Sequence, residues 1–179
     1  KVNKNKKVKI SKFFKFLSHG LPLEFARSWK SMLLSLVVFF GALMVGIVST
    51  ANDIEYATEI MGSRYIQMTD ENIKNGDPMA VYHQHENSAW SSFRLTQHNT
   101  RIAAFTYTSG IILGIPPVII MIKNGIMLGT FHYYLYHKGV LSDAMWIIWI
   151  HGVLEISAII IAGGAGLLLG GGLLFPGTY

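Results

Sequence analysis

The feature that most constrains this chain is a 32-residue hydrophobic run at positions 144–175, interrupted by one formal charge, Glu155, and by His151. A helix rises about 1.5 Å per residue and the hydrocarbon core of a bilayer is about 30 Å thick, so this run is long enough to cross a membrane. A second run, at 31–51, holds 21 residues without a charge. With 51% hydrophobic and 14% charged residues overall, the sequence predicts an integral membrane protein.

The distribution of charge predicts how the chain is oriented. Nine of its fifteen Lys and Arg residues lie within 1–30, whereas 52–98 holds three basic and seven acidic residues. The positive-inside rule therefore places the N-terminus of a multi-pass protein in the cytoplasm and 52–98 outside. The net charge of +5 belongs to a membrane flank attracted to anionic lipids, so we expect lipid rather than nucleic acid as a partner.

Four regions follow from these patterns. Residues 1–30 form a basic, amphipathic cytoplasmic flank, 31–51 a transmembrane helix, 52–98 an acidic extracytoplasmic segment of short helices, and 99–179 a transmembrane core with broken helices. The chain starts without Met and ends directly after a hydrophobic run, which predicts a piece of a longer protein. Absence of cysteine excludes disulfides and thiolate chemistry.

Within the core, breaks are predicted at Pro, Asn-Gly and Gly-Gly positions. We expect a second span at 99–122 with a kink or break at Pro116 and Pro117, and then a re-entrant or interfacial half-helix at 124–137. A further span at 142–162 would end at Gly163 and Gly164 and be followed by a short helix at 165–175. The predicted fold class is thus an all-α, polytopic membrane protein with broken or re-entrant helices and a small extracytoplasmic helical segment.

Small residues recur at the spacing that lets helix backbones approach closely. Three Gly-xxx-Gly patterns occupy three successive segments, and one such pattern alone is weak evidence for a contact. Together they predict a tightly packed bundle or an oligomer, with the double glycine contributing: Gly110, Gly114, Gly125, Gly129, Gly163, Gly164, Gly166 and Gly170.

His151 and Glu155, four residues apart, are predicted to share one face of a membrane helix. Three readings remain open: a bonded pair that fixes packing, a polar route for protons, ions or a substrate, and an intramembrane zinc site. Zinc would lack the second His of a protease helix unless His132 or His137 supplied a ligand. Asn99, Arg101 and Asn124 complete the predicted intramembrane polar core. A separate metal site at His83, His85, Glu86 and His98 lacks ligand spacing, so we expect no metal or other cofactor.

The motifs of the core resemble one protein family. Residues 150–166 together with 124–129 are similar to the signature of the stage II sporulation protein M family of bacterial membrane proteins, and 99–114 resembles its second conserved helix. The similarity covers most of 27–179, although many members have Pro where Ile150 and Ser157 stand. The acidic segment at 52–98 resembles the version found in non-sporulating Gram-negative bacteria.

The resemblance implies a role in a membrane complex. The family's namesake localises peptidoglycan-degrading proteins at a septal membrane, and the resemblance carries no catalytic residues. The sequence also has no Ser or Cys in a nucleophile setting, no phosphate loop and no pair of acidic residues for glycoside chemistry. We therefore expect a non-enzymatic scaffold or complex subunit, oligomeric or bound to other membrane proteins and linked to cell-envelope remodelling. The alternative is a small channel or transporter that uses His151 and Glu155.

Overall fold

Helices make up the regular structure of the described chain. A computed structural model describes residues 10–77, 80 and 88–177, and for 88–95, 147, 150 and 151 it describes the backbone alone. In order, the elements are η1 (Phe16–Gly20), α2 (Leu21–Arg27), α3 (Trp29–Asn52), α4 (Tyr56–Met61), α5 (Ser63–Lys74), α7 (Ser88–Thr108), η2 (Ser109–Ile111), α8 (Ile115–His137) and α9 (Leu141–Leu174). Three of them, α3, α8 and the 152–174 part of α9, are long and apolar enough to cross a membrane. The all-α membrane class predicted from the sequence is confirmed.

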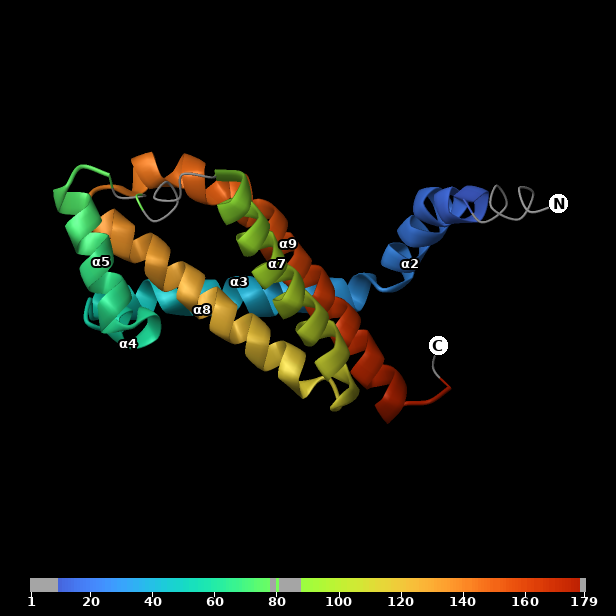
Figure 1. Cartoon of the computed structure of the whole chain (residues 1–179). Coiled ribbons are helices and arrows are strands. Elements are labelled where there is room, and N and C mark those ends of the chain that lie inside the picture. Colours follow the sequence, from blue (N-terminus) through green and yellow to red (C-terminus); the bar gives the residue numbers. More distant parts are fainter. Residues whose placement is uncertain (1–9, 78–79, 81–87, 178–179) are drawn as a thin grey trace.

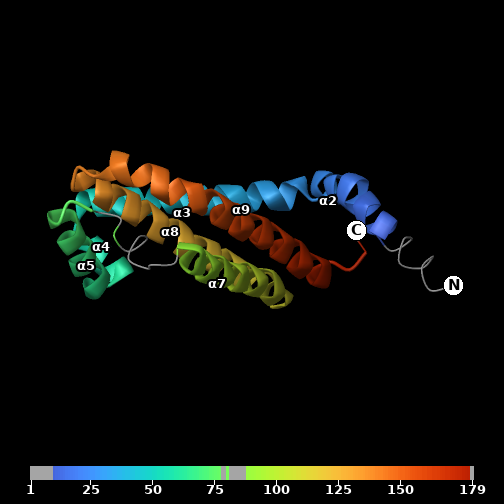
Figure 2. The ribbon, with the colours of Figure 1, turned by 45° about the horizontal axis from the view of Figure 1, so that its top comes forward.

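Helices α3 and α8 run in the same direction, with α7 and α9 opposed to them (Figures 1 and 2). Gly125 of α8 faces Phe39 and Ala42 of α3, whereas Gly129 faces Leu43 and Ile47. Helix α9 runs the other way, because its Ile160 lies opposite Ser35 and its Gly164 opposite Met32.

Helix α7 returns the chain to the end of the bundle where α3 begins. Its Ile102 packs near Ile159, and Gly110 just beyond it touches Gly166, so α7 runs parallel to α9. The turn that follows α7 carries an exposed apolar tip, with Ile111 at 62% and Ile112 at 60% exposure. An apolar tip at that end fits an environment of lipid rather than water.

Helices α4 and α5 form a small cap over the opposite end of the bundle, where α3 and α8 end (Figure 1). Ala57 and Ile66 of the cap pack with Tyr134 of α8, and the ring of Tyr65 meets that of Phe131 edge-on at 6.0 Å. The expectation of short helices after the first span therefore holds for 56–74, while residues 88–98 belong to α7 instead.

Of the breaks predicted within the core, the one at the prolines is confirmed, whereas those at Asn-Gly and Gly-Gly are wrong. The helices are interrupted at 112–114, and Pro116 and Pro117 open α8, because a proline in the first helical turn lacks only an N–H that has no partner there. Gly114, at φ 73°, makes the left-handed turn that precedes them.

No half-helix begins at Asn124, since α8 is continuous from Ile115 to His137. The Asn124 amide returns to its own helix and donates to the carbonyl of Ile120 at 2.8 Å. Likewise α9 continues through Gly163 and Gly164, which pack against Met121 and Met32. In each case the glycines serve close helix contacts and the backbone stays helical.

One polar cluster at the cap end of the bundle fastens the cap to α8. The Asp70 carboxylate of α5 accepts a hydrogen bond from the Tyr134 hydroxyl at 2.6 Å and pairs with the Lys138 ammonium at 2.8 Å. Burial alone would raise the pKa of Asp70, but the bonds from Lys138 and Tyr134 lower it below its usual value. The bond to Asp70 raises the pKa of Lys138, against the opposing effect of burial.

Replacing Asp70 with asparagine is expected to loosen α5 by about 1–2 kcal/mol, since a charge-assisted bond is lost. In the parent protein, the Asp70 carboxylate contributes its full stabilisation above the ordinary carboxyl pKa of about 4, and this contribution is lost as pH falls through the lowered pKa of Asp70. The Lys138 ammonium contributes its full stabilisation below the ordinary lysine pKa of about 10.4, and this contribution is lost as pH rises through the raised pKa of Lys138. Amide hydrogen exchange of α5 measures both effects. Glu71→Gln on the same helix is the control, and equal exchange in the two variants would contradict the link.

Candidate functional site

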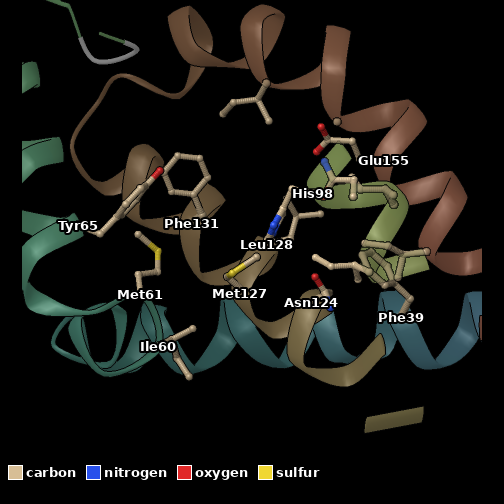
Figure 3. A pocket seen from close by; sticks show the side chains of 16 residues that line it. Phe39, Ile60, Met61, Tyr65, His98, Asn124, Met127, Leu128, Phe131 and Glu155 are labelled. Carbon is tan, nitrogen blue, oxygen red and sulfur yellow. The ribbon is translucent and has the colours of Figure 1, made fainter. Parts of the chain in front are cut away.

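A mostly apolar cavity of about 380 Å³ lies where the cap meets α3, α7, α8 and α9. Its walls include Phe39, Met61, Tyr65, Ile102, Phe131, Ile148 and Ile159. The polar side chains that line it are His98, Asn99, Asn124 and Glu155. Figure 3 shows Glu155 from α9 and His98 from α7 on one side of the cavity, with Tyr65 and Phe131 on the other side. The arrangement is a hydrophobic pocket with one polar end.

The polar end brings together residues that are far apart in the sequence. Glu155 is half-buried, and Asn99 has a side-chain nitrogen that is buried and meets no hydrogen-bond partner among the described residues. Three members of the predicted polar core, Asn99, Asn124 and Glu155, thus share one cavity. The side chain of His151 lies outside the described residues, so the predicted His151–Glu155 pair is not placed.

Arg101 was predicted to belong to the intramembrane polar core, but its side chain is exposed and does not line the cavity with Glu155. It lines a second hollow, of about 410 Å³, together with Lys123 of α8. His98, Ile102 and Asn124 line both hollows, which therefore adjoin along the seam between α7 and α8. The polar residues of the core divide into an inner group around Glu155 and an outer, basic pair.

The predicted packing glycines meet in two interfaces. At the first, Gly125 and Gly129 of α8 lie against the backbone of α3, while Gly46 of α3 lies against Ile126. A Cβ added to Gly125 would come 2.5 Å from the Phe39 carbonyl oxygen. Side chains larger than hydrogen would therefore push these helices apart.

At the second interface, Gly110 meets Gly166 and Gly114 meets Gly170. A Cβ added to Gly166 would come 2.8 Å from both the Thr106 carbonyl oxygen and the Pro117 ring. The end of α7 and the start of α8 are thereby held against α9.

Sequence reasoning missed the polar bond at the centre of the bundle. Ser35 of α3 is fully buried and donates to the carbonyl of Ile160 at 2.5 Å, with the sulfur of Met121 2.9 Å away. It therefore joins α3, α8 and α9. A signal was present, because Ser35, Ala42 and Gly46 are small residues that recur on one buried stripe of α3.

Metal ligands do not gather within the described part of the chain, where no group of three His, Asp or Glu could hold an ion. His132 instead places its Nδ1 2.8 Å from the Leu128 carbonyl and its ring edge-on to Trp149. His83, His85 and Glu86, weighed above as ligands with His98, lie outside the described residues.

A comparison with protein families decides the relationship. The model of the family described as stage II sporulation protein M matches residues 35–179. The chain belongs to that family. The resemblance inferred from the motifs at 99–114, 124–129 and 150–166 is confirmed. No curated protein and no solved structure gives a significant match.

For this member of the stage II sporulation protein M family, the matched region begins at Ser35 and so includes the interhelical bond, both glycine interfaces and the cavity. The motif at 124–129, which lies within the matched region, contains Asn124 and the glycines that meet α3. The motif at 150–166 contains Glu155 and Gly166. The quoted motifs therefore coincide with the polar end of the cavity and with the contacts that hold its walls.

Proposed function

We propose that this protein is a non-enzymatic scaffold, a subunit around which a complex of the bacterial cytoplasmic membrane assembles. The observation that carries the proposal is backbone-to-backbone packing at both glycine interfaces, which makes α3, α7, α8 and α9 one interlocked body. Scaffolds need fixed outer faces, and such packing supplies them. The family's namesake suggests cell-envelope or peptidoglycan remodelling as the setting, with the N-terminus cytoplasmic and the cap outside.

A structural role for the polar end of the cavity supports this proposal. Asn124 bonds its own helix, and Glu155 has an interaction partner. Phe39, Met121 and Ile159 form a buried apolar cluster within the bundle. Transport by alternating access requires one part of a bundle to rock against another, and helices in backbone contact resist such movement.

A channel or transporter is the second candidate. The observation in its favour is that Glu155, His98, Asn99 and Asn124 line one cavity, because ionisable residues at membrane depth mark proton and ion routes in many transporters. In this alternative, Glu155 and His151 carry the proton or ion.

Glu155→Gln combined with His151→Ala separates the two functions. We expect the full chain to be isolated from native membranes as a complex, to give no proton or ion flux in liposomes, and to lose assembly in the variant because the polar centre of its packing is removed. Affinity isolation and a pH-sensitive dye measure these outcomes, with Glu71→Gln in the cap as control. Flux in the parent that the variant loses while assembly persists would refute the scaffold.

A further inference from the structure

Two basic side chains face outward from the same hollow between α7 and α8. Arg101 and Lys123 are both exposed, and Phe105 and Ile120 provide apolar walls beside them. Helix α8 is apolar enough to cross a membrane and α7 lies beside it, so we expect exposed surface at this seam to face lipid. Such a position is unusual for basic residues, which in spanning segments are rare and face a protein interior or a water-filled cavity.

The hollow lies near the middle of the bundle's length. Ile102, next to Arg101, packs on the central cluster of Phe39, Met121 and Ile159. Along α8, Lys123 follows Met121 of that cluster by two residues. It precedes by two residues Gly125, which contacts Phe39 and Ala42 of α3. Along the helix axes, Arg101 is about 10 Å from the end of α7 and Lys123 about 12 Å from the start of α8.

Neither basic residue has an acidic partner in the described chain. Glu24 pairs with Arg27 and Asp70 with Lys138, so neither carboxylate serves Arg101 or Lys123. None of the described residues that line the hollow is acidic. Glu155 lines the adjoining inner cavity instead, where it is half-buried. The described residues therefore supply no neutralising charge for Arg101 and Lys123.

We propose that this hollow receives a membrane helix of another protein, which places an Asp or Glu side chain between Arg101 and Lys123. This inference rests on the proposed scaffold function and names the chemistry of one partner. Phospholipid phosphates are disfavoured because they lie at the edges of a hydrocarbon core about 30 Å thick. A second copy of the chain is disfavoured as well. In its described crossing helices the acidic residues are Asp143, in the first turn of α9, and the half-buried Glu155.

A photo-crosslinking amino acid at Phe105 tests the occupant in native membranes. The same group at Val37, which is exposed on α3 outside both hollows, is the control. We expect the Phe105 probe to crosslink to a membrane helix that carries Asp or Glu. Arg101→Leu with Lys123→Leu should reduce that crosslink at least about tenfold, because a buried acid would be left unpaired. Arg101→Lys with Lys123→Arg should retain it.

Charge exchange completes the test. Arg101→Glu with Lys123→Glu should lose the crosslink, and changing the captured helix's acidic residue to Lys should restore it. The purified double-leucine variant should melt no lower than the parent, since no bond within the chain is removed.

Several results would overturn the inference: crosslinks to lipid or to a second copy, a crosslink unaffected by the leucines, or a lower melting temperature. If the double-leucine variant still isolates with its complex, the hollow is not the partner's site although the scaffold function stands. If the parent isolates with no complex, both proposals fail.

Discussion

Gly129→Ala is expected to destabilise the bundle by about 1–3 kcal/mol, the usual cost of overfilling a well-packed interior. A Cβ at this position would overlap the Leu43 carbonyl oxygen and lie 2.9 Å from the Leu43 carbonyl carbon. Both are backbone atoms, so no side chain can rotate to make room, and α3 and α8 must separate. Equilibrium unfolding of the full chain in mixed detergent micelles measures the change.

The matched control for Gly129→Ala is Gly41→Ala. Gly41 belongs to α3, and a Cβ added there meets nothing within 4 Å. Alanine at an open helical position should be neutral or stabilising by about 0.5–1 kcal/mol, because glycine has the greater backbone entropy to lose. Opposite signs for the two substitutions are therefore expected. If Gly129→Ala were as stable as the parent, α3 and α8 would not be in backbone contact.

Gly110→Ala is expected to release α7 from its place beside α9. The new Cβ would lie 2.7 Å from the Gly166 Cα and carbonyl carbon, which are again backbone atoms. Helix α7 is not among the helices apolar enough to cross a membrane alone, and it carries Arg101. Its depth therefore depends on packing, and losing the contact should let it move toward the cap side.

Cysteine labelling can follow that movement, because the chain has no cysteine of its own. We place one probe at the exposed Tyr107 and apply a membrane-impermeant maleimide from each side. Gly110→Ala should lower labelling from the side opposite the cap several-fold relative to the parent, because Tyr107 lies at that end of α7 and would be drawn into the bilayer. Gly152→Ala on α9 is the control, since its Cβ would meet only side chains at 3.9 Å. Unchanged labelling in Gly110→Ala would mean that α7 holds its depth without this contact.

Much of the fold could be predicted because hydrophobic length alone defines a membrane span. The uncharged run at 31–51 corresponds to α3, and the small-residue patterns fall at close helix contacts. What failed was the use of Asn-Gly and Gly-Gly as break signals, whereas the two prolines do mark the break before α8. In water these residues weaken a helix, but in lipid the backbone has no competing partner, and an adjacent helix stabilises a glycine that packs against it.

The candidate site was predictable only in part. Charge and amide groups within apolar runs identified Glu155, Asn124 and Asn99, which line one cavity. The same criterion could not tell that Arg101 turns outward to Lys123. The direction in which the Arg101 side chain faces depends on how α7 packs against α9, and no local sequence pattern predicts that packing. The Asp70 link was also missed, because its two partners follow more than sixty residues later in the chain.

The parallel course of α3 and α8 has a consequence for how the protein is made. Helix α3 leaves the ribosome first, with Ser35 and Gly46 prepared for partners that are synthesised only after the cap and α7. During that interval its small-residue stripe is open to any neighbouring helix in the membrane. Helix α7 must likewise wait for α9 before its glycine contact can form. Assembly is therefore largely post-insertional, and the insertion machinery or a bound partner would have to shield both helices until α9 arrives.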